Sequence, residues 1–308
     1  MRMGKASRTK QQPDRRARIA AQREAERRRE QRKRIYLAGG SVLVVAIIAI
    51  AFVIFKSNGG GASTGSNGPT GAALAAVVKT TTSVPATALD KVGSGGSSVY
   101  SPPFKLTPAQ PALTSGGKPE MLYVGAEYCP YCAAERWAMV VALSRFGTFT
   151  GLATVHSSST DTDANTPTWT FAKATYTSPY LVFDSVEEFT NIPTSDGYTT
   201  LETPTAAEQA VFTKYDSTPF ISSSADDGAY PFVDFGNKYE ISGASYNPQV
   251  LDGKSWATIA AALSDPSSAI AQAVDGTAND ITAAICELTG NQPATACTTV
   301  VKSIEPKL

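Results

Sequence analysis

The sequence is poor in the residues that most often bind metals: its 308 residues include one histidine and four cysteines. His156 alone cannot form a histidine metal site, and a lone histidine at a strand end is more often hydrogen-bonded or at the surface than a catalytic base. A four-cysteine zinc site would have to join Cys129 and Cys132 to the remote pair Cys286 and Cys297. The ten-residue gap within that second pair departs from the usual short ligand spacing. We therefore expect no metal and no cofactor.

Basic and acidic residues balance at 27 each, but they are separated along the chain. Residues 1–34 carry 14 Lys+Arg against 4 Asp+Glu, whereas residues 35–308 carry 13 against 23. The basic segment has no interleaved aromatic residues, so nucleic-acid binding is not expected of it. Segments of this kind beside a membrane span are commonly topology signals or contacts to anionic lipid.

Residues 35–55 contain no charged side chain. As a helix, these 21 residues would extend about 31 Å and match the hydrocarbon core of a membrane. The basic cluster lies before them and only Lys56 follows closely, so the positive-inside rule places residues 1–34 in the cytoplasm. A cleaved signal peptide is the alternative, although its apolar core usually has about 7–15 residues. We expect a single-pass cell-membrane protein with a cytoplasmic N-terminus and an extracytoplasmic C-terminal domain.

Residues 57–71 lack any large apolar side chain, so they cannot bury enough surface to fold. A flexible linker is expected over residues 56–71, and the folded domain over residues 72–308.

Hydrophobic periodicity in the folded domain predicts alternating strands and helices. The expected elements are a short helix between Pro85 and Gly93, a buried strand over 121–124, a helix from Cys129 to Gly147, a strand over 152–156, an inserted β-hairpin over 168–183, a helix over 205–214, a second hairpin over 230–243 and helices within 254–301. This order predicts an α/β fold with a mixed central sheet flanked by helices.

The motif Cys129-Pro130-Tyr131-Cys132 lies where the expected strand gives way to a helix. The unpaired amides and the dipole of a helix N-terminus stabilise a thiolate and lower the thiol pKa. Cys129 is therefore the expected nucleophile. Cys132, one turn further on and more buried, is the expected resolving cysteine. Pro130 suits the first helical position, and Tyr131 is expected to be exposed and to shape partner access.

About a hundred residues later, Tyr230-Pro231 precedes an apolar run. A proline there cannot donate to the strand ladder, and in the cis form it turns the neighbouring carbonyl and amide toward an adjacent surface. We expect Tyr230 and Pro231 to hold an extended substrate peptide beside Cys129.

These residues resemble known proteins at two levels. CPYC after a short apolar strand, followed much later by PFVDFGNKY, is similar to the thioredoxin superfamily, in which that proline is cis and flanks the redox pair. The Pro-Tyr dipeptide resembles that of glutaredoxins, and the proline-led hairpin resembles that of Dsb-type extracytoplasmic oxidoreductases. The runs YVGAEYCPYCAAERWAMVVALSRFG and NTPTWTFAKATYTSPYLVF resemble the domain of unknown function 929 family of bacterial and archaeal membrane proteins, over roughly residues 81–308. The first resemblance implies a thioredoxin-like sheet and thiol-disulfide chemistry, and the second supplies no established activity.

Thioredoxins also keep a buried acid beneath the resolving cysteine, and no equivalent can be placed in this sequence. Glu135, one helical turn beyond Tyr131, is expected to be solvated, and Glu127 is expected to be a loop carboxylate.

Cys286 and Cys297 are expected to form a structural disulfide that pins the end of the last helical region. Closing that loop would stabilise the fold by about 3 kcal/mol. A second redox relay from Cys129 and Cys132 to this pair is the alternative, and it requires that the two pairs lie close together.

The sequence thus predicts a membrane-anchored, extracytoplasmic thiol-disulfide oxidoreductase that oxidises or isomerises secreted proteins. Its partners would be thiol- or disulfide-bearing proteins and a redox partner that recycles the pair, with the direction of transfer set by reduction potential. Two alternatives stay open. One is a non-catalytic thioredoxin-like binding or assembly domain with structural disulfides, and the other is a redox sensor that signals through residues 1–34.

Overall fold

The computed structural model describes residues 68–308, with the exception of residue 225. The expected cytoplasmic segment 1–34, the expected transmembrane segment 35–55 and the expected linker up to residue 67 lie outside the described residues. Within the described range, no helix by itself has both the length and the hydropathy needed to cross a membrane. Helices α3 (Gly71–Thr82) and α4 (Ala86–Val92), bent by 57° where they meet, satisfy both conditions only as a pair.

Side-chain caps explain where several helices begin. Thr205 and Glu208 form a reciprocal capping box at the start of α6 (Ala206–Tyr215), and the Ser268 side chain accepts a hydrogen bond from the Ala271 amide at the start of α8 (Ala269–Leu288). The remaining helices are α5 (Pro130–Leu143), α6 (Ala206–Tyr215), α7 (Trp256–Ala262), α8 (Ala269–Leu288) and α9 (Thr299–Lys302), with 3-10 turns η1 (Gly96–Ser98), η2 (Pro248–Leu251) and η3 (Glu305–Lys307).

A six-stranded sheet lies at the centre of the fold. It consists of β1 (Phe104–Lys105), β12 (Tyr239–Ser242), β11 (Phe232–Phe235), β3 (Lys118–Gly125) and β2 (Thr114–Ser115) in that order, with β8 (Val182–Glu187) also paired to β3. The β3–β8 pair is parallel and the other pairs are antiparallel, so the sheet is mixed. Helix α5 lies in the connection between the two parallel strands.

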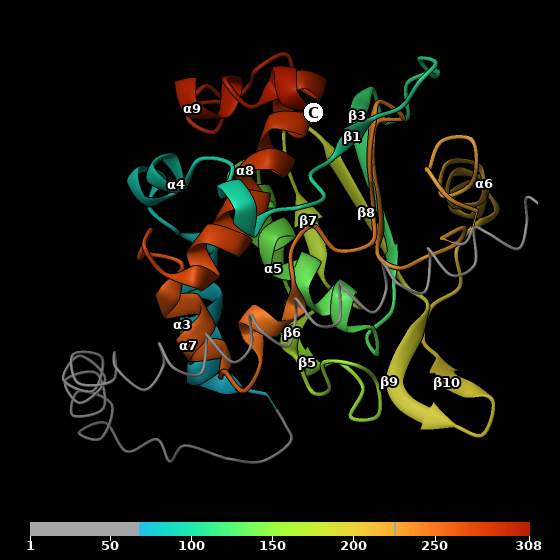
Figure 1. Ribbon diagram of the computed structural model, residues 1–308, viewed down its shortest axis with the longest axis vertical. Coiled ribbons are helices and arrows are strands. Elements are labelled where there is room, and N and C mark those ends of the chain that lie inside the picture. Colours follow the sequence, from blue (N-terminus) through green and yellow to red (C-terminus); the bar gives the residue numbers. More distant parts are fainter. Residues whose placement is uncertain (1–67, 225) are drawn as a thin grey trace, which may run out of the picture. The chain divides into compact units, whose positions relative to one another are not determined.

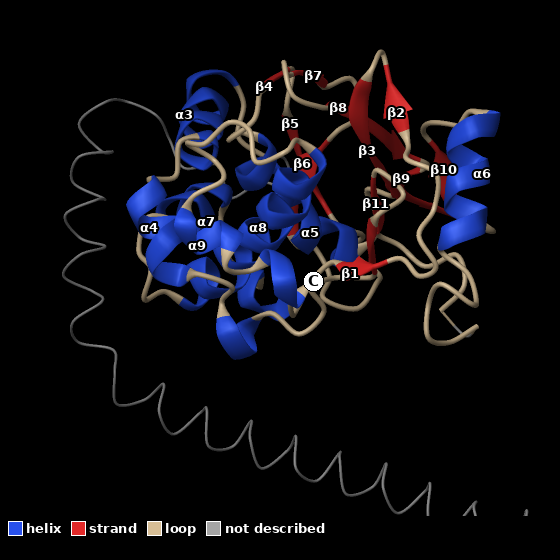
Figure 2. Ribbon diagram, turned by 90° about the horizontal axis from the view of Figure 1, so that it is seen from above, coloured by secondary structure: helices blue, strands red, loops and turns tan. Residues whose placement is uncertain are grey.

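Both faces of this sheet are buried. Met121 and Tyr123 of β3 join the larger apolar cluster with α5 and α8, whereas Leu122 and Val124 pack on the opposite face with Phe212 of α6. Alternate residues of a strand point to opposite faces, which explains the division. Figure 2 shows α6 on one side of the sheet and α3, α4, α5, α7, α8 and α9 on the other. The predicted α/β class with a mixed sheet flanked by helices is confirmed.

Several local predictions are also confirmed. The helix after Cys129 is α5, the short helix after Pro85 is α4, and the helix over 205–214 is α6. The hairpin over 230–243 is β11–β12. Gly236 and Asn237 form its turn with φ of 64° and 55°, a conformation that glycine adopts without strain and asparagine tolerates.

The expected hairpin over residues 168–183 is wrong. Its two halves pair with earlier strands and not with each other: β6 (Pro167–Thr170) pairs with β5 (Ala153–His156), and β7 (Thr175–Thr177) pairs with β4 (Thr148–Thr150). Phe183 belongs to β8 of the central sheet. Abundant β-forming residues identified strands correctly, but local sequence does not specify the partner of a strand. The hairpin that projects from the sheet edge in Figure 1 is instead β9 (Phe189–Thr194) with β10 (Gly197–Thr200).

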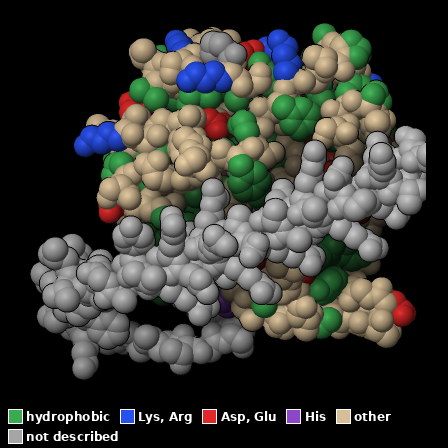
Figure 3. Space-filling model, in the orientation of Figure 1, with side chains coloured by type: hydrophobic (Ala, Val, Ile, Leu, Met, Phe, Trp, Pro, Cys, Tyr) green, Lys and Arg blue, Asp and Glu red, His purple; other side chains and the backbone are tan. Residues whose placement is uncertain are grey.

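The surface seen in Figure 3 outside the grey atoms is mixed in character. Apolar side chains are scattered among polar ones, and the Lys and Arg side chains in view lie mainly toward the upper part. Scattered apolar side chains of this kind are normal on a protein surface.

Candidate functional site

Cys129 is the N-cap of α5. Its sulfur accepts a hydrogen bond from the Cys132 backbone amide at 3.3 Å, and Pro130 takes the first helical position. Both cysteines are free thiols, with exposed fractions of 6% for Cys129 and 0% for Cys132. The capping bond satisfies one of the amides that a helix N-terminus leaves unpaired. The predicted difference in burial between the two thiols is confirmed.

The proline-led hairpin lies against this pair. The Cys129 thiol donates to the Tyr230 carbonyl at a sulfur–oxygen distance of 3.8 Å, and the Tyr230–Pro231 peptide bond is cis. The antiparallel register of β11 on β3 places Phe232 opposite Val124, close to the loop that leads to Cys129. Sheet pairing therefore brings together segments that lie 101 residues apart.

The two thiols have opposite electrostatic environments. The Cys132 thiol, as a hydrogen-bond donor, lowers the pKa of the Cys129 thiol; the Cys132 amide and the Arg136 guanidinium add to this effect, while burial opposes it. Burial raises the pKa of Cys132 well above its usual value, and the Cys129 sulfur acts in the same direction. Cys129 is accordingly the thiol that ionises first, as a nucleophile must.

An ion pair lies behind the cysteines. Arg136 Nη1 donates to Glu187 Oε2 at 2.7 Å and Oε1 at 2.9 Å, and both side chains have exposed fractions of 0%. The same nitrogen donates to the Tyr123 hydroxyl at 3.1 Å and the Ala126 carbonyl at 3.3 Å. Although burial opposes it, the Glu187 carboxylate raises the pKa of Arg136, so the guanidinium stays charged. A full positive charge is thus held in the core next to the cysteine pair.

Gly125 lets the Tyr123 hydroxyl approach Cys132. A Cβ on Gly125 would lie 2.3 Å from Tyr123 Oη and 2.9 Å from Cys132 Sγ, closer than such atoms approach in proteins. The Tyr123 hydroxyl and the Cys132 sulfur therefore lie near one another at this position.

Aromatic residues surround the exposed side of the pair. Tyr131 is 42% exposed, as predicted, and every other residue of α5 is buried. The Tyr128 ring stacks on Tyr198 of the β9–β10 hairpin with ring centroids 4.0 Å apart. The Tyr230 hydroxyl donates to the Glu188 carboxylate, just before that hairpin. The hairpin is thereby held against the loop that carries Cys129.

Aromatic strand residues and one acid near the site are buried. Trp169, Phe171, Phe232, Phe235 and Tyr239 belong to the core, as is usual for aromatic strands. The expectation that Glu135 is solvated is wrong. Its exposed fraction is 0%, its carboxylate accepts from the Ser245 amide at 2.9 Å, and burial raises its pKa to about 7.

Cys286 and Cys297 form a disulfide, as predicted. Arg145, just after α5, donates to the Ala296 carbonyl at 2.7 Å and to Asn279 Oδ1 of α8 at 2.9 Å. The bridged loop is therefore bound to the C-terminal end of α5, whereas Cys129 and Cys132 lie at its N-terminal end.

Other candidate positions do not join this site. His156 packs edge-on against Trp256, with ring centroids 4.5 Å apart. Among the described residues, no three side chains of His, Cys, Asp or Glu come together in a way that could hold a metal ion.

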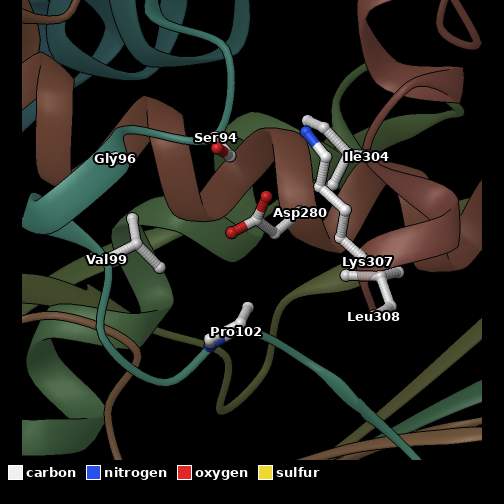
Figure 4. Close-up of a pocket in the computed structure, with 8 residues that line it drawn as sticks. All are labelled: Ser94, Gly96, Val99, Pro102, Asp280, Ile304, Lys307 and Leu308. Atoms are coloured by element: carbon white, nitrogen blue, oxygen red, sulfur yellow. The ribbon is translucent and has the colours of Figure 1, made fainter.

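A small cavity lies elsewhere in the fold. Its volume is about 120 Å³, and Figure 4 shows the Asp280 carboxylate of α8 reaching into it near Ser94. Its lining residues are Ser94, Gly96, Val99, Pro102, Asp280, Ile304, Lys307 and Leu308. None of the site residues predicted from the sequence lines this cavity, so it is separate from the cysteine pair.

Arg136, Glu187 and Tyr123 are not among the site residues predicted from the sequence. Arg136 follows Cys132 by four residues and therefore shares its helix face, a spacing that could have signalled a charge beside the thiol. The position of Glu187 depends on the parallel pairing of β8 with β3, which no local pattern specifies.

The chain matches one family model. The family described as "Domain of unknown function (DUF929)" matches residues 103–287, more than half of the 308 residues. That range contains Cys129, Cys132 and Pro231. Comparison with curated proteins gave no match, and comparison with solved structures gave none either.

Proposed function

The chain belongs to the family described as domain of unknown function (DUF929), and on that premise we propose that it is a membrane-anchored, extracytoplasmic thiol-disulfide oxidoreductase. One observation carries the proposal. The Cys129 sulfur caps α5, has a lowered pKa, and lies between a fully buried second thiol and the Tyr230 carbonyl. A helix N-terminus of this kind is where reactive cysteines are found.

The proposed reaction has two steps. The Cys129 thiolate attacks one sulfur of a substrate disulfide; a sulfur–sulfur bond to Cys129 forms, the substrate bond breaks, and the leaving sulfur departs as a thiolate that takes up a proton. The Cys132 thiolate then attacks the Cys129 sulfur and displaces the second substrate thiolate. Two electrons pass from the protein dithiol to the substrate. The reverse sequence oxidises a substrate dithiol, and the recycling partner and the reduction potential decide the direction.

Tyr230, Pro231 and Tyr131 are proposed to hold the substrate chain. Tyr131 is exposed at the first turn of α5, and the backbone at Tyr230 lies against the Cys129 sulfur. An extended peptide placed along this backbone would bring its own sulfur next to Cys129. The order β3, α5, β8 and the proline-led β11–β12 hairpin support a thioredoxin-like fold for the domain.

The membrane anchor is proposed from the uncharged residues 35–55 and the basic residues before them. Removing residues 1–55 from the chain should move it from the membrane fraction to the soluble fraction of the expressing cell. If the shortened chain stays with membranes through an alkaline wash, residues 35–55 are not the anchor.

Cysteine reactivity and redox titration test the proposed function. In the reduced full-length chain, iodoacetamide should alkylate Cys129 faster than a model thiol at neutral pH, because its thiolate fraction is larger. Titration in glutathione buffers should give one reversible two-electron couple that disappears in Cys129→Ser. The Cys286–Cys297 disulfide, followed by mass spectrometry in the same samples, serves as the internal control.

An unreactive Cys129 thiol, or a pair that stays oxidised in strongly reducing buffer, would contradict the proposal. The chain would then be better described as a non-catalytic binding or assembly domain in which both cysteine pairs are structural.

A further inference from the structure

The second step of the proposed reaction poses a physical problem at Cys132. Its side chain is fully buried, and burial raises the pKa of its thiol well above the usual value. Only the thiolate attacks a disulfide, so the negative charge must form inside the core. A charge formed there is costly unless nearby groups donate hydrogen bonds to it.

Tyr123 has the geometry of such a donor. It is fully buried on β3, and its hydroxyl oxygen accepts a hydrogen bond from Arg136 Nη1 at 3.1 Å. The oxygen is therefore occupied as an acceptor by a cation, which leaves the hydroxyl proton free to be donated and makes it a stronger donor.

Two acceptors lie within reach of that proton. Glu187 Oε2 is 3.5 Å from the Tyr123 oxygen, at the limit of a hydrogen bond, and its carboxylate already accepts two shorter bonds from Arg136. The Cys132 sulfur is the other: a Cβ on Gly125 would lie 2.3 Å from the Tyr123 oxygen and 2.9 Å from this sulfur, so the two atoms are neighbours. The backbone at Ala126 acts to lower the pKa of the same thiol. The Tyr123 proton can thus turn from an already satisfied carboxylate to a sulfur that is gaining charge.

The Tyr123 hydroxyl is polarised by Arg136, and Glu187 balances the charge of that guanidinium. Their charges cancel as a pair, so the core gains no net charge until Cys132 ionises. Arg136 Nη2 has no hydrogen-bond partner among the described residues, so the guanidinium still has unused donor capacity.

We propose that the Tyr123 hydroxyl, polarised by Arg136, donates a hydrogen bond to the Cys132 sulfur as it becomes the attacking thiolate, and so accelerates resolution of the mixed disulfide without acting on Cys129. The inference rests on the proposed function. It assigns Tyr123 to the second step alone, which makes the two claims separable in one experiment.

The probe is dithionitrobenzoate, an aromatic disulfide that releases a coloured thiolate. The full-length chain in detergent is first reduced under conditions that mass spectrometry shows to leave the Cys286–Cys297 bridge intact. Attack by Cys129 forms a mixed disulfide and releases one coloured thiolate. Attack by Cys132 forms the protein disulfide and releases the second, so two protein electrons reduce one molecule of reagent and the two thiol protons enter the buffer. Stopped-flow absorbance resolves the two releases.

Tyr123→Phe removes only the hydroxyl. A hydrogen bond to a charged group is worth enough to make the second release about 10- to 100-fold slower, while the first release stays within about twofold of the unmodified chain. The pH profile of the second release should shift upward by about one unit or more, an effect that a loss of packing alone does not produce.

Two further variants separate this role from a structural one. Gly125→Ala places a methyl group against both Tyr123 Oη and Cys132 Sγ and forces them to shift, so it should slow the second release although both side chains remain. Tyr246→Phe is the matched control, because Tyr246 is also fully buried and its hydroxyl donates to the Ala134 carbonyl of α5 and not to a cysteine. It should leave both releases unchanged.

The outcomes are distinguishable. If the unmodified chain releases only one thiolate or none, the proposed function fails. If it releases two and Tyr123→Phe does so at unchanged rates, or slows both releases equally, the role of Tyr123 is wrong while the oxidoreductase stands. If Tyr123→Phe does not fold, the Gly125→Ala kinetics and the pH profile of its second release decide the same question.

Discussion

Arg136 and Glu187 form a fully buried ion pair at the site, and their energetics follow from that burial. Taking two charges out of water is expensive, so such a pair adds little net stability. Removing one partner is different, because the other charge stays in the core without compensation.

Glu187→Gln should therefore lower the free energy of unfolding by about 3–5 kcal/mol, since Arg136 would keep its charge in an apolar environment. Urea denaturation of the full-length chain measures the change. The matched control is Glu287→Gln, which breaks the Lys238–Glu287 pair, whose side chains are 37% and 23% exposed, and which should cost about 1 kcal/mol or less. Equal losses for the two variants would show that the Arg136–Glu187 pair is no more important than a surface contact.

The cysteine positions could be predicted because their signals are local. The signals are a strand, a proline at the first helical position and two cysteines separated by two residues, and all of them lie within one short stretch of sequence. The exposure of Tyr131 is predictable from the same stretch. Glu135 was misjudged because its charge suggested solvent, whereas α5 is covered on all sides except at Tyr131. The Glu187 partner of Arg136 could not be found, since it arrives through a parallel strand pairing.

At the scale of elements, α8 combines a buried polar stretch with a covalent constraint at its end. Asp275, Thr277, Asn279, Asp280 and Thr282 are all buried, and Cys286 in its last turn is bridged to Cys297. A helix with so many buried polar groups gains less from apolar burial than its length suggests. The disulfide stabilises the fold by limiting the unfolded chain.

Replacing both Cys286 and Cys297 by alanine should lower the free energy of unfolding by about 3 kcal/mol, the chain-entropy value for a loop of this length. Urea denaturation of the full-length chain checks it, and Cys129→Ser with Cys132→Ser is the control that removes two thiols without breaking a bridge. Because the bridged loop binds the opposite end of α5 from Cys129, the dithionitrobenzoate kinetics should not change. A change in those kinetics would favour a relay between the two cysteine pairs.

Elements whose ends are marked by nearby capping or turn residues could be predicted from the sequence. Pairings that depend on residues far along the chain could not. The Thr205 capping box, the Pro85 and Gly93 boundaries of α4 and the Gly236 turn each act within a few residues. The strands in residues 168–183 were recognised as strands, but their partners lie in β4 and β5, and the sequence of one strand does not name its neighbour.

Across the whole molecule, carboxyl groups are buried on both sides of the sheet. Burial raises the pKa of each: Glu135, Asp234 and Asp280 to about 7, Asp275 to about 8 and Glu240 to about 9. In the unfolded chain these groups lose their protons near pH 4, roughly. Between those values the native state holds protons that the unfolded state has released, so stability is greatest in acid and falls as pH rises.

Thermal denaturation of the full-length chain should therefore show a lower midpoint at about pH 8 than at about pH 5, with each such group contributing up to about 1.4 kcal/mol per pH unit in its window. Asp275→Asn should reduce this slope, because both carboxylate oxygens of Asp275 lack a hydrogen-bond partner within the described residues and its proton is held only by burial. Asp265→Asn, at an exposed position, should leave the slope unchanged. A midpoint that rises with pH would contradict the buried-acid explanation.

The Cys129 sulfur accepts a hydrogen bond from the Cys132 amide, so the atom proposed to react also caps its own helix. In a mixed disulfide the Cys129 sulfur would lack the negative charge that makes a thiolate a good hydrogen-bond acceptor, so its hydrogen bond from the Cys132 amide would weaken. If the proposed function holds, the first turn of α5 would lose this hydrogen bond in each mixed disulfide and regain it when the thiolate returns. Tyr131 is exposed on that turn and would change position with it. A protein bound at Tyr131 would then be held with an affinity that depends on whether Cys129 is a thiolate or part of a mixed disulfide. Binding and release of that protein would be coupled to the reaction at the sulfur.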